Sequence, residues 1–87
     1  MNQSILFSDG QQWNPEKQCI ILYAQQMGNL IPCLVFVSWL TSESGETITN
    51  ELDALRIFEE YRFDIEEHAE ALIEDEEFNA SGEVEIK

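Results

Sequence analysis

The sequence has few basic residues, and this shortage excludes whole classes of function. Only four lysines and arginines stand against eighteen aspartates and glutamates, which gives a net charge of −14. Proteins hold nucleic acids and anionic membrane surfaces through clustered basic side chains, and these four are scattered along the chain (Lys17, Arg56, Arg62 and Lys87). The sequence therefore predicts no direct binding to nucleic acid and no binding to membranes.

A long apolar run, a secretory leader and a cysteine framework are also missing. No stretch approaches the roughly 18 apolar residues of a membrane span, and the opening Met-Asn-Gln-Ser does not resemble a secretory signal. Cys19 and Cys33 lie in apolar, strand-like runs, without the spacing or the neighbouring base of a reactive thiol. We therefore expect a cytoplasmic protein with two buried cysteines.

What the chain does have is enough apolar content for one folded domain. It has 87 residues, of which 44% are hydrophobic, so residues 1–87 form a single domain with a thin two-layer core. The pattern predicts an α+β fold with a small antiparallel sheet. Its strands are an N-terminal one at residues 4–7, ended by Ser8-Asp9-Gly10, a central hairpin over residues 19–37, and a short C-terminal edge strand at residues 83–86.

The central hairpin is apolar on both faces. With the turn at residues 27–29, Gln26 faces Leu30, and both sides of the sheet then carry large hydrophobic residues. A helix can cover one face. The other face needs a second cover: the predicted turn segment around Trp13, the Trp39-Leu40 segment within a single helical turn at residues 38–40, or another subunit.

An acidic stretch at residues 50–77 carries an apolar stripe at helical spacing. Twelve carboxylates and two arginines lie in it. The stripe consists of Ala54, Leu55, Phe58, Tyr61, Ile65, Ala69, Leu72 and Ile73. It predicts one long helix over about 50–77, packed on one face of the sheet, with Thr49 or Asn50 as the N-cap. Asp64 and Glu67 resemble a capping box, so a bend or a restart of the helix near Phe63 is the alternative.

The outer side of this helix places like charges next to each other. The pairs Glu60/Asp64, Glu66/Glu70 and Glu70/Glu74 each cost roughly 0.2–0.5 kcal/mol. Such a conflict marks either function or a face kept acidic for solubility. Phe63 points away from the apolar stripe into this acidic surface, which suits a basic partner, a dimer contact or, if the helix breaks at Asp64, a core position. We therefore predict that a basic protein partner binds there, through Glu59, Phe63, Glu66, Glu67, Glu70 and Glu74.

Other polar residues are predicted to be structural. Arg62 packs its stem on the apolar stripe and reaches Glu66 or Glu59. His68 forms a hydrogen bond with Asp64, and this pair supplies too few ligands for a metal site.

No catalytic set and no cofactor motif is present, so we predict a non-enzymatic interaction or regulatory protein without a cofactor. Two alternatives stay open. One is a homodimer that forms a ligand pocket or a weak catalytic site at its apolar sheet face. The other is divalent-cation binding at residues 74–77, the acidic end of the predicted helix.

Several segments of the chain resemble a small bacterial family catalogued as domain of unknown function family 1488. They are residues 1–7, Trp13, residues 54–58 and residues 61–74. The resemblance implies a compact, cytoplasmic α+β domain with no assigned activity, and Pro32 departs from the family pattern. Members are often encoded beside a shikimate-pathway gene, and the family carries a label as a regulator of that pathway. No functional residues are defined for the family, so the resemblance transfers none.

Overall fold

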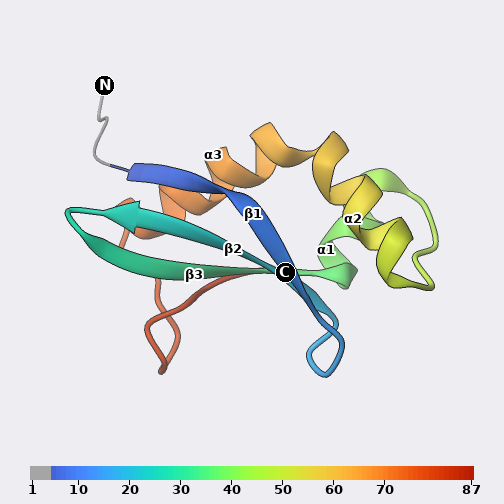
Figure 1. The fold of residues 1–87 in the computed structure, drawn as a ribbon, viewed down its shortest axis with the longest axis horizontal. Helices are drawn as coiled ribbons and strands as arrows, with labels where there is room; N and C mark the ends of the chain where they lie inside the picture. The colour runs from blue at the N-terminus through green and yellow to red at the C-terminus, as the bar shows by residue number, and fades with distance from the viewer. Residues whose placement is uncertain (1–4) are drawn as a thin grey trace.

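The structure is a computed structural model that describes residues 5–87, and it contains a four-stranded sheet and three helices (Figure 1). The strands are β1 (Ile5–Asn14), β2 (Cys19–Gln26), β3 (Asn29–Phe36) and β4 (Val84–Ile86); the helices are α1 (Val37–Ser44), α2 (Glu51–Glu60) and α3 (Arg62–Glu74). The predicted α+β class is confirmed. Ser4, part of the predicted first strand, lies outside the described residues.

The sheet is mixed rather than antiparallel as predicted. Its order is β1-β2-β3-β4, and β4 pairs with β3 in the parallel direction. The reason is the path of the chain between these two strands. The three helices carry it from the end of β3 back along the sheet, so β4 begins at the same end of the sheet as β3.

The hairpin of β2 and β3 closes through two residues instead of the predicted three. Met27 and Gly28 both have positive φ, 53° and 85°, as in the tight turn that suits the twist of paired strands. Gln26 therefore faces Asn29, and the predicted pairing with Leu30 is wrong by one residue. Positive φ is uncommon for methionine, so the sequence pattern did not indicate this turn.

β1 is longer than predicted and contains a bulge. The register shifts between Phe7 and Gln11, so Ser8-Asp9-Gly10 interrupts the strand without ending it. The turn that follows occupies residues 15–18. Asn14 supports it by accepting a hydrogen bond of 3.0 Å from the Lys17 N–H.

The predicted long helix is two helices that meet at Tyr61. The backbone of Tyr61 has φ −108° and ψ 18°, yet its N–H still bonds to Ile57 and its carbonyl accepts from Ile65. The bend therefore lies at Tyr61 rather than near Phe63, and α3 ends at Glu74 rather than at 77. Asn50 is the N-cap of α2, as predicted, and accepts from the Asp53 N–H at 2.9 Å.

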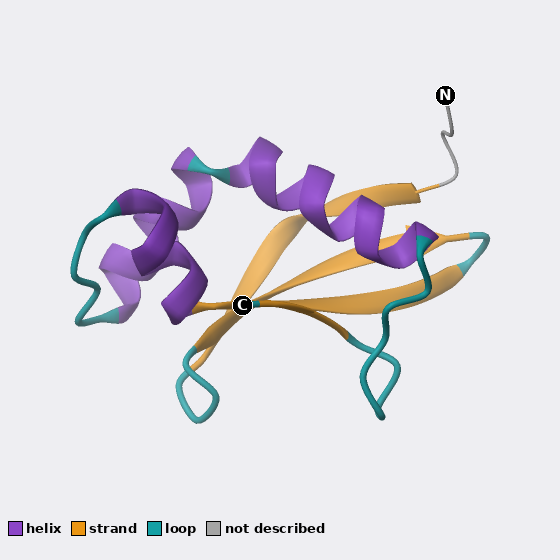
Figure 2. Ribbon diagram, turned by 180° about the vertical axis from the view of Figure 1, so that it is seen from behind, coloured by secondary structure: helices purple, strands orange, loops and turns teal. Residues whose placement is uncertain are grey.

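α3 runs along one face of the sheet, and α1 and α2 gather at one end of it (Figure 2). α1 extends well beyond the single turn predicted at residues 38–40. Gly45, with φ 73°, ends it by donating its N–H to the Thr41 carbonyl.

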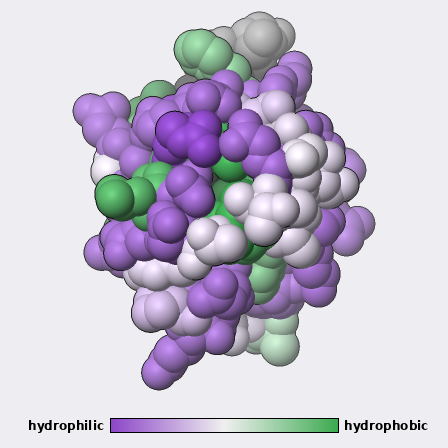
Figure 3. All heavy atoms as spheres, turned by 90° about the vertical axis from the view of Figure 1, so that its right-hand side faces the viewer, coloured by the Kyte–Doolittle hydropathy of each residue, from purple (hydrophilic) through white to green (hydrophobic). Residues whose placement is uncertain are grey.

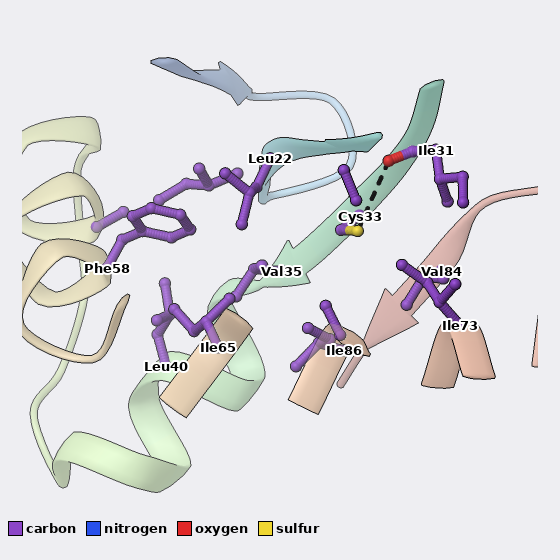
Figure 4. Close-up of a cluster of buried hydrophobic side chains, with 14 of the residues drawn as sticks. Leu22, Ile31, Cys33, Val35, Leu40, Phe58, Ile65, Ile73, Val84 and Ile86 are labelled. Carbon is purple, nitrogen blue, oxygen red and sulfur yellow. Dashed lines mark hydrogen bonds between the residues drawn. The ribbon is translucent and has the colours of Figure 1, made fainter. Parts of the chain in front are cut away.

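The core lies between the helices and this face of the sheet. Side chains from all four strands and all three helices converge there, among them Leu22, Val35, Leu40, Phe58 and Ile65 (Figure 4). Phe58 and Ile65 are fully buried, and Leu55 and Leu72 pack against the core while partly exposed. The predicted inward side of the helical stretch is confirmed.

The opposite face of the sheet has no helix over it among residues 5–87 (Figures 1 and 2). Trp13, Trp39 and Leu40, from the two segments predicted as possible covers, all join the core on the helical face. Leu6 and Leu30, on the uncovered face, remain 63% and 67% exposed. Cys19 and Leu34 lie on the same face and are buried, so the chain itself covers part of it. For the exposed part around Leu6 and Leu30, another subunit is the cover that remains of the three considered from the sequence.

Burial of Cys33 gives the fold a measurable dependence on pH. Burial raises the pKa of this thiol from its usual 9.0 to about 12, because the thiolate loses its hydration in the core. In the unfolded chain the thiol ionises near its usual pKa. The folded state is therefore favoured in full below pH 9, and it loses this contribution as the pH rises from 9 toward about 12.

We predict that the free energy of unfolding, measured by urea denaturation, falls across this alkaline range. It should fall less steeply in a Cys33→Ala variant, which lacks the ionising group. Equal slopes in the two proteins would contradict the prediction.

Candidate functional site

The negative charge of the protein lies entirely outside the core. No charged or polar side chain is buried among residues 5–87, and twelve of the eighteen carboxylates fall in residues 50–77, which include α2 and α3. Figure 3 views the end of the molecule where α1 and α2 lie, and hydrophilic residues cover most of that surface. A functional site on this protein is therefore a surface feature.

A groove of about 410 Å³ lies between α3 and the beginning of β1. It is lined by Ile5, Phe7, Phe63, Asp64, Glu66, Glu67 and Glu70. α3 packs toward β4 and α2 toward β2, which leaves this groove between α3 and the first residues of β1. It combines apolar side chains from both elements with a row of carboxylates from α3.

Phe63 is the most exposed of the hydrophobic residues that line the groove. Its side chain is 87% exposed, although it lies in the first turn of a helix whose other side forms the core. Glu66, Glu67 and Glu70 follow at positions i+3, i+4 and i+7, so they share one side of α3 with the aromatic ring. Phe63 therefore stands at one end of a row of acidic side chains.

Arg62 ties this part of α3 to the bulge in β1. Its Nε donates to the Glu66 carboxylate at 2.8 Å. Its Nη1 donates to the Gln11 side chain at 3.3 Å, and its Nη2 donates to the Ser8 carbonyl. The guanidinium also lies 5.9 Å from the centre of the Phe58 ring. Arg62 therefore holds the bulge to the helical layer, together with the hydrogen bond that the Gln11 side chain donates to Glu59.

Both ion pairs predicted for Arg62 are present: Glu66 lies at 2.8 Å and Glu59 at 3.9 Å. The contacts with Ser8 and Gln11 were not predicted. They join residues more than fifty positions apart in the chain, and no local pattern indicates such a contact.

The structure brings only part of the predicted partner-binding set together. Phe63, Glu66, Glu67 and Glu70 line the groove, whereas Glu59 and Glu74 do not. Glu59 instead accepts a 2.7 Å hydrogen bond from Gln11.

Three further lining residues were not predicted to belong to the site. Asp64 was assigned only a structural role. Ile5 and Phe7 lie two residues apart in a strand, so they share one side of it, but the sequence does not show that α3 lies beside that side.

His68 does not make its predicted hydrogen bond with Asp64. Its ring instead meets Trp39 of α1 edge-on, with 6.1 Å between the ring centres. Within residues 5–87, no group of three or more histidine, cysteine or acidic side chains is arranged to hold a metal ion. The alternative of a cation site at residues 74–77 therefore gains no support from this part of the chain.

A second, smaller hollow of about 210 Å³ lies beside β4. Its lining is Leu72, Glu77, Phe78, Asn79, Glu85 and Lys87. Hydrogen bonds from Asn79 and then Lys87 hold the pKa of Glu85 below its usual range, so this carboxylate is already engaged. In the groove beside β1, by contrast, Asp64, Glu67 and Glu70 have no hydrogen bond or ion pair within residues 5–87.

None of the helices in residues 5–87 combines the length and the apolar character that a membrane span requires. This result agrees with the sequence, in which no long apolar run occurs.

Comparison with known proteins gives matches along almost the whole chain. A family model described as "Protein of unknown function (DUF1488)" matches residues 5–86. The chain is 30% identical to the uncharacterised protein YrdB of Escherichia coli K12 and 29% identical to YrdB of Shigella flexneri, with 94% of each chain covered.

A crystal structure of a DUF1488 protein from Shewanella loihica PV-4 is 42% identical, with a TM-score of 0.93 over 99% of this chain and 94% of that one. None of these descriptions names an activity, a ligand or a partner. The role in the shikimate pathway implied by the resemblance has no support in these matches.

The contacts of Arg62 predict its effect on stability. We expect Arg62→Ala to lower the free energy of unfolding by about 1–2 kcal/mol, because it removes several charge-assisted hydrogen bonds from a partly buried site. Arg62→Lys should recover little, since an ammonium group does not reproduce the planar set of donors. Urea denaturation measures both effects.

Arg56→Ala is the matched control. The Arg56 side chain is 50% exposed and its ion pairs lie at 3.1–3.9 Å on the surface, so its loss should matter less than that of Arg62. Equal destabilisation by Arg62→Ala and Arg56→Ala would show that the bulge does not depend on Arg62.

Proposed function

The chain belongs to the DUF1488 family of proteins of unknown function, and because membership names no activity, we propose a function from the groove itself. We propose that this is a non-enzymatic interaction or regulatory protein. In this proposal, a basic protein surface binds in the groove between α3 and the beginning of β1.

The observation that carries the proposal is an exposed aromatic ring next to carboxylates that have no hydrogen-bond or ion-pair partner within residues 5–87. Four carboxylates line the groove and no basic residue does. One of the four, Glu66, is paired with Arg62, which leaves three. Phe63 offers an apolar anchor at the end of this row, and it is 87% exposed. A partner with an apolar pocket ringed by lysine or arginine complements both features.

The two parts of the groove have different physical roles. Exposed ion pairs each contribute little free energy and are screened by salt. Burial of Phe63 in a pocket of the partner supplies the larger share of the affinity, as aromatic anchors do at other interfaces. The net charge of −14 raises the rate of encounter with a basic partner. Binding should therefore depend on Phe63 at every salt concentration and on the glutamates mainly at low salt.

A basic partner would also relieve the repulsion stored on α3. Glu66 and Glu70 are like charges four residues apart, which destabilises a helix by roughly 0.2–0.5 kcal/mol. Lysine or arginine side chains placed over this row would turn that repulsion into attraction. A regulator of this composition would act through protein contacts, since the chain offers no basic cluster to nucleic acid.

Groove variants test the proposal in affinity capture from a bacterial lysate. We expect wild type to retain a basic protein that Phe63→Ser and the double variant Glu67→Gln/Glu70→Gln lose. The control, Glu16→Gln/Glu43→Gln, removes the same charge at two exposed sites away from the groove and should retain it. Raising the salt to about 1 M, where the Debye length falls to about 3 Å, should reduce the amount of partner retained by the wild type.

Quantitative mass spectrometry of the captured proteins measures each outcome. Identical retention by the wild type and both groove variants would refute the proposal. Salt-independent retention would count against its electrostatic part.

The uncovered face of the sheet favours a second candidate function, a homodimer. The register places Leu6 with Leu30 in one row of this face and Ile21 with Leu34 in another. Leu34 is buried, so Leu6 and Leu30 supply most of the open apolar area. The only charged residue in these rows is Glu85, which is paired with Lys87 at 3.1 Å. Two such faces could pack with the acidic helices on opposite outer sides. A more specific version of this proposal is that the two packed faces form a ligand pocket between them.

Sedimentation or light scattering tests the dimer. The candidate predicts a mass near twice 10.1 kDa at micromolar concentration, and Leu30→Lys should restore the monomer by placing a charge in the interface. Met27→Lys, in the exposed turn beside it, carries the same charge change and should not. A monomer in the unmodified protein would exclude this candidate.

A further inference from the structure

β1 is an edge strand, and its first residues, Ile5–Phe7, have one free side. The sheet order places β2 on one side of β1 and no strand of residues 5–87 on the other. Alternate residues of a strand direct their N–H and C=O groups to opposite sides. Part of the backbone at Ile5–Phe7 therefore points away from β2, and no hydrogen bond within residues 5–87 uses that outer side.

The bulge in β1 and the edge at β4 are protected. Beyond Phe7 comes the bulge, where Arg62 donates a hydrogen bond to the Ser8 carbonyl and Glu59 accepts a hydrogen bond from Gln11. On the far side of the sheet, β4 is only three residues long. Bulges, charged side chains and short strands are the usual means of preventing an edge from pairing. The stretch Ile5–Phe7 lacks these protections.

The free edge and the groove are parts of one surface. Ile5 and Phe7 line the groove, whereas Leu6 projects to the opposite face of the sheet and is 63% exposed. A chain that pairs with this edge must also alternate. One set of its side chains would enter the groove beside α3, and the other set would lie next to Leu6.

We propose that the basic partner binds as an extended segment that adds a strand to the outer edge of β1 at Ile5–Phe7. The inference rests on the proposed function and specifies the shape of the partner. The segment carries lysine or arginine at alternate positions, facing Asp64, Glu67 and Glu70, with apolar residues between them. These carboxylates span six helical residues, about 9 Å. That length equals about three strand residues, so two alternate basic side chains fit along it.

A short pairing is sufficient in this fold. β4 joins the sheet through three residues, which pair with Cys33–Val35 of β3. An added strand at Ile5–Phe7 would form a ladder of similar length, and contacts with Phe63 and the carboxylates would add to it. Main-chain hydrogen bonds supply affinity in this mode of recognition, and alternate side chains supply specificity.

N-methylated peptides test the inference directly. The parent is a capped peptide of about six residues, the usual length of a strand, with alternating lysine and valine. One derivative is methylated on the lysine amides and the other on the valine amides. In an added strand only one of these sets faces β1, so we expect one derivative to bind at least about tenfold more weakly and the other to bind like the parent. Fluorescence anisotropy measures all three, with the wild type, Glu67→Gln/Glu70→Gln and Glu16→Gln/Glu43→Gln.

Each outcome has a distinct meaning. Three results together support the added strand. The parent peptide binds the wild type and the control variant, it binds the groove variant only weakly, and methylation of one of the two amide sets abolishes its binding. If both derivatives bind alike, strand addition is overturned and the proposed function survives. If the parent binds the groove variant as tightly as the wild type, the groove is not the site. If the parent does not bind at all, the inference is overturned, and the proposed function is then decided separately by affinity capture with the groove variants.

Discussion

The packing of one side of α3 against the sheet is the interaction on which the rest of the structure depends. Ile65, Ala69 and Ile73 recur at intervals of four residues and are buried, so α3 has a single possible orientation toward the core. Burying that side turns Glu66, Glu67 and Glu70 away from the core. Because α3 lies toward β4, it also leaves a groove between its acidic side and the beginning of β1. The acidic row and the groove thus follow from the same apolar contact.

Arg62 is the polar counterpart of that contact. The apolar stripe positions α3 relative to β3 and β4, but it does not fix the position of the far edge of the sheet. Arg62, at the first position of α3, reaches across to Ser8 and Gln11 on β1. The bend at Tyr61 places the guanidinium there, over the ring of Phe58. One side chain therefore links the helix bend, the bulge and the groove wall, through its ion pair with Glu66.

Local features of the structure could be predicted from the sequence, and features that depend on distant residues could not. The buried side of the helical stretch, the Asn50 cap and the exposure of Phe63 depend on neighbours within a few positions. The hairpin register failed because Met27 adopts a positive φ that its residue type does not favour. The parallel direction of β4, the bulge and the position of Ile5 and Phe7 beside α3 all arise from tertiary contacts. The side of the candidate site that α3 forms could therefore be predicted from the sequence, whereas the side that β1 forms could not.

The two walls together determine what can approach the groove. A bare edge strand is a general hazard, because it can pair with any other edge, including that of a second copy. Here the edge lies beside Asp64, Glu67 and Glu70. A second copy that paired through β1 would bring its own three carboxylates to the same place, and like charges so close together repel. A basic segment would be attracted to these carboxylates, whereas a second copy of the chain would be repelled by them. The carboxylates therefore discriminate between partners, and this selectivity accounts for a row of like charges that weakens the helix carrying it.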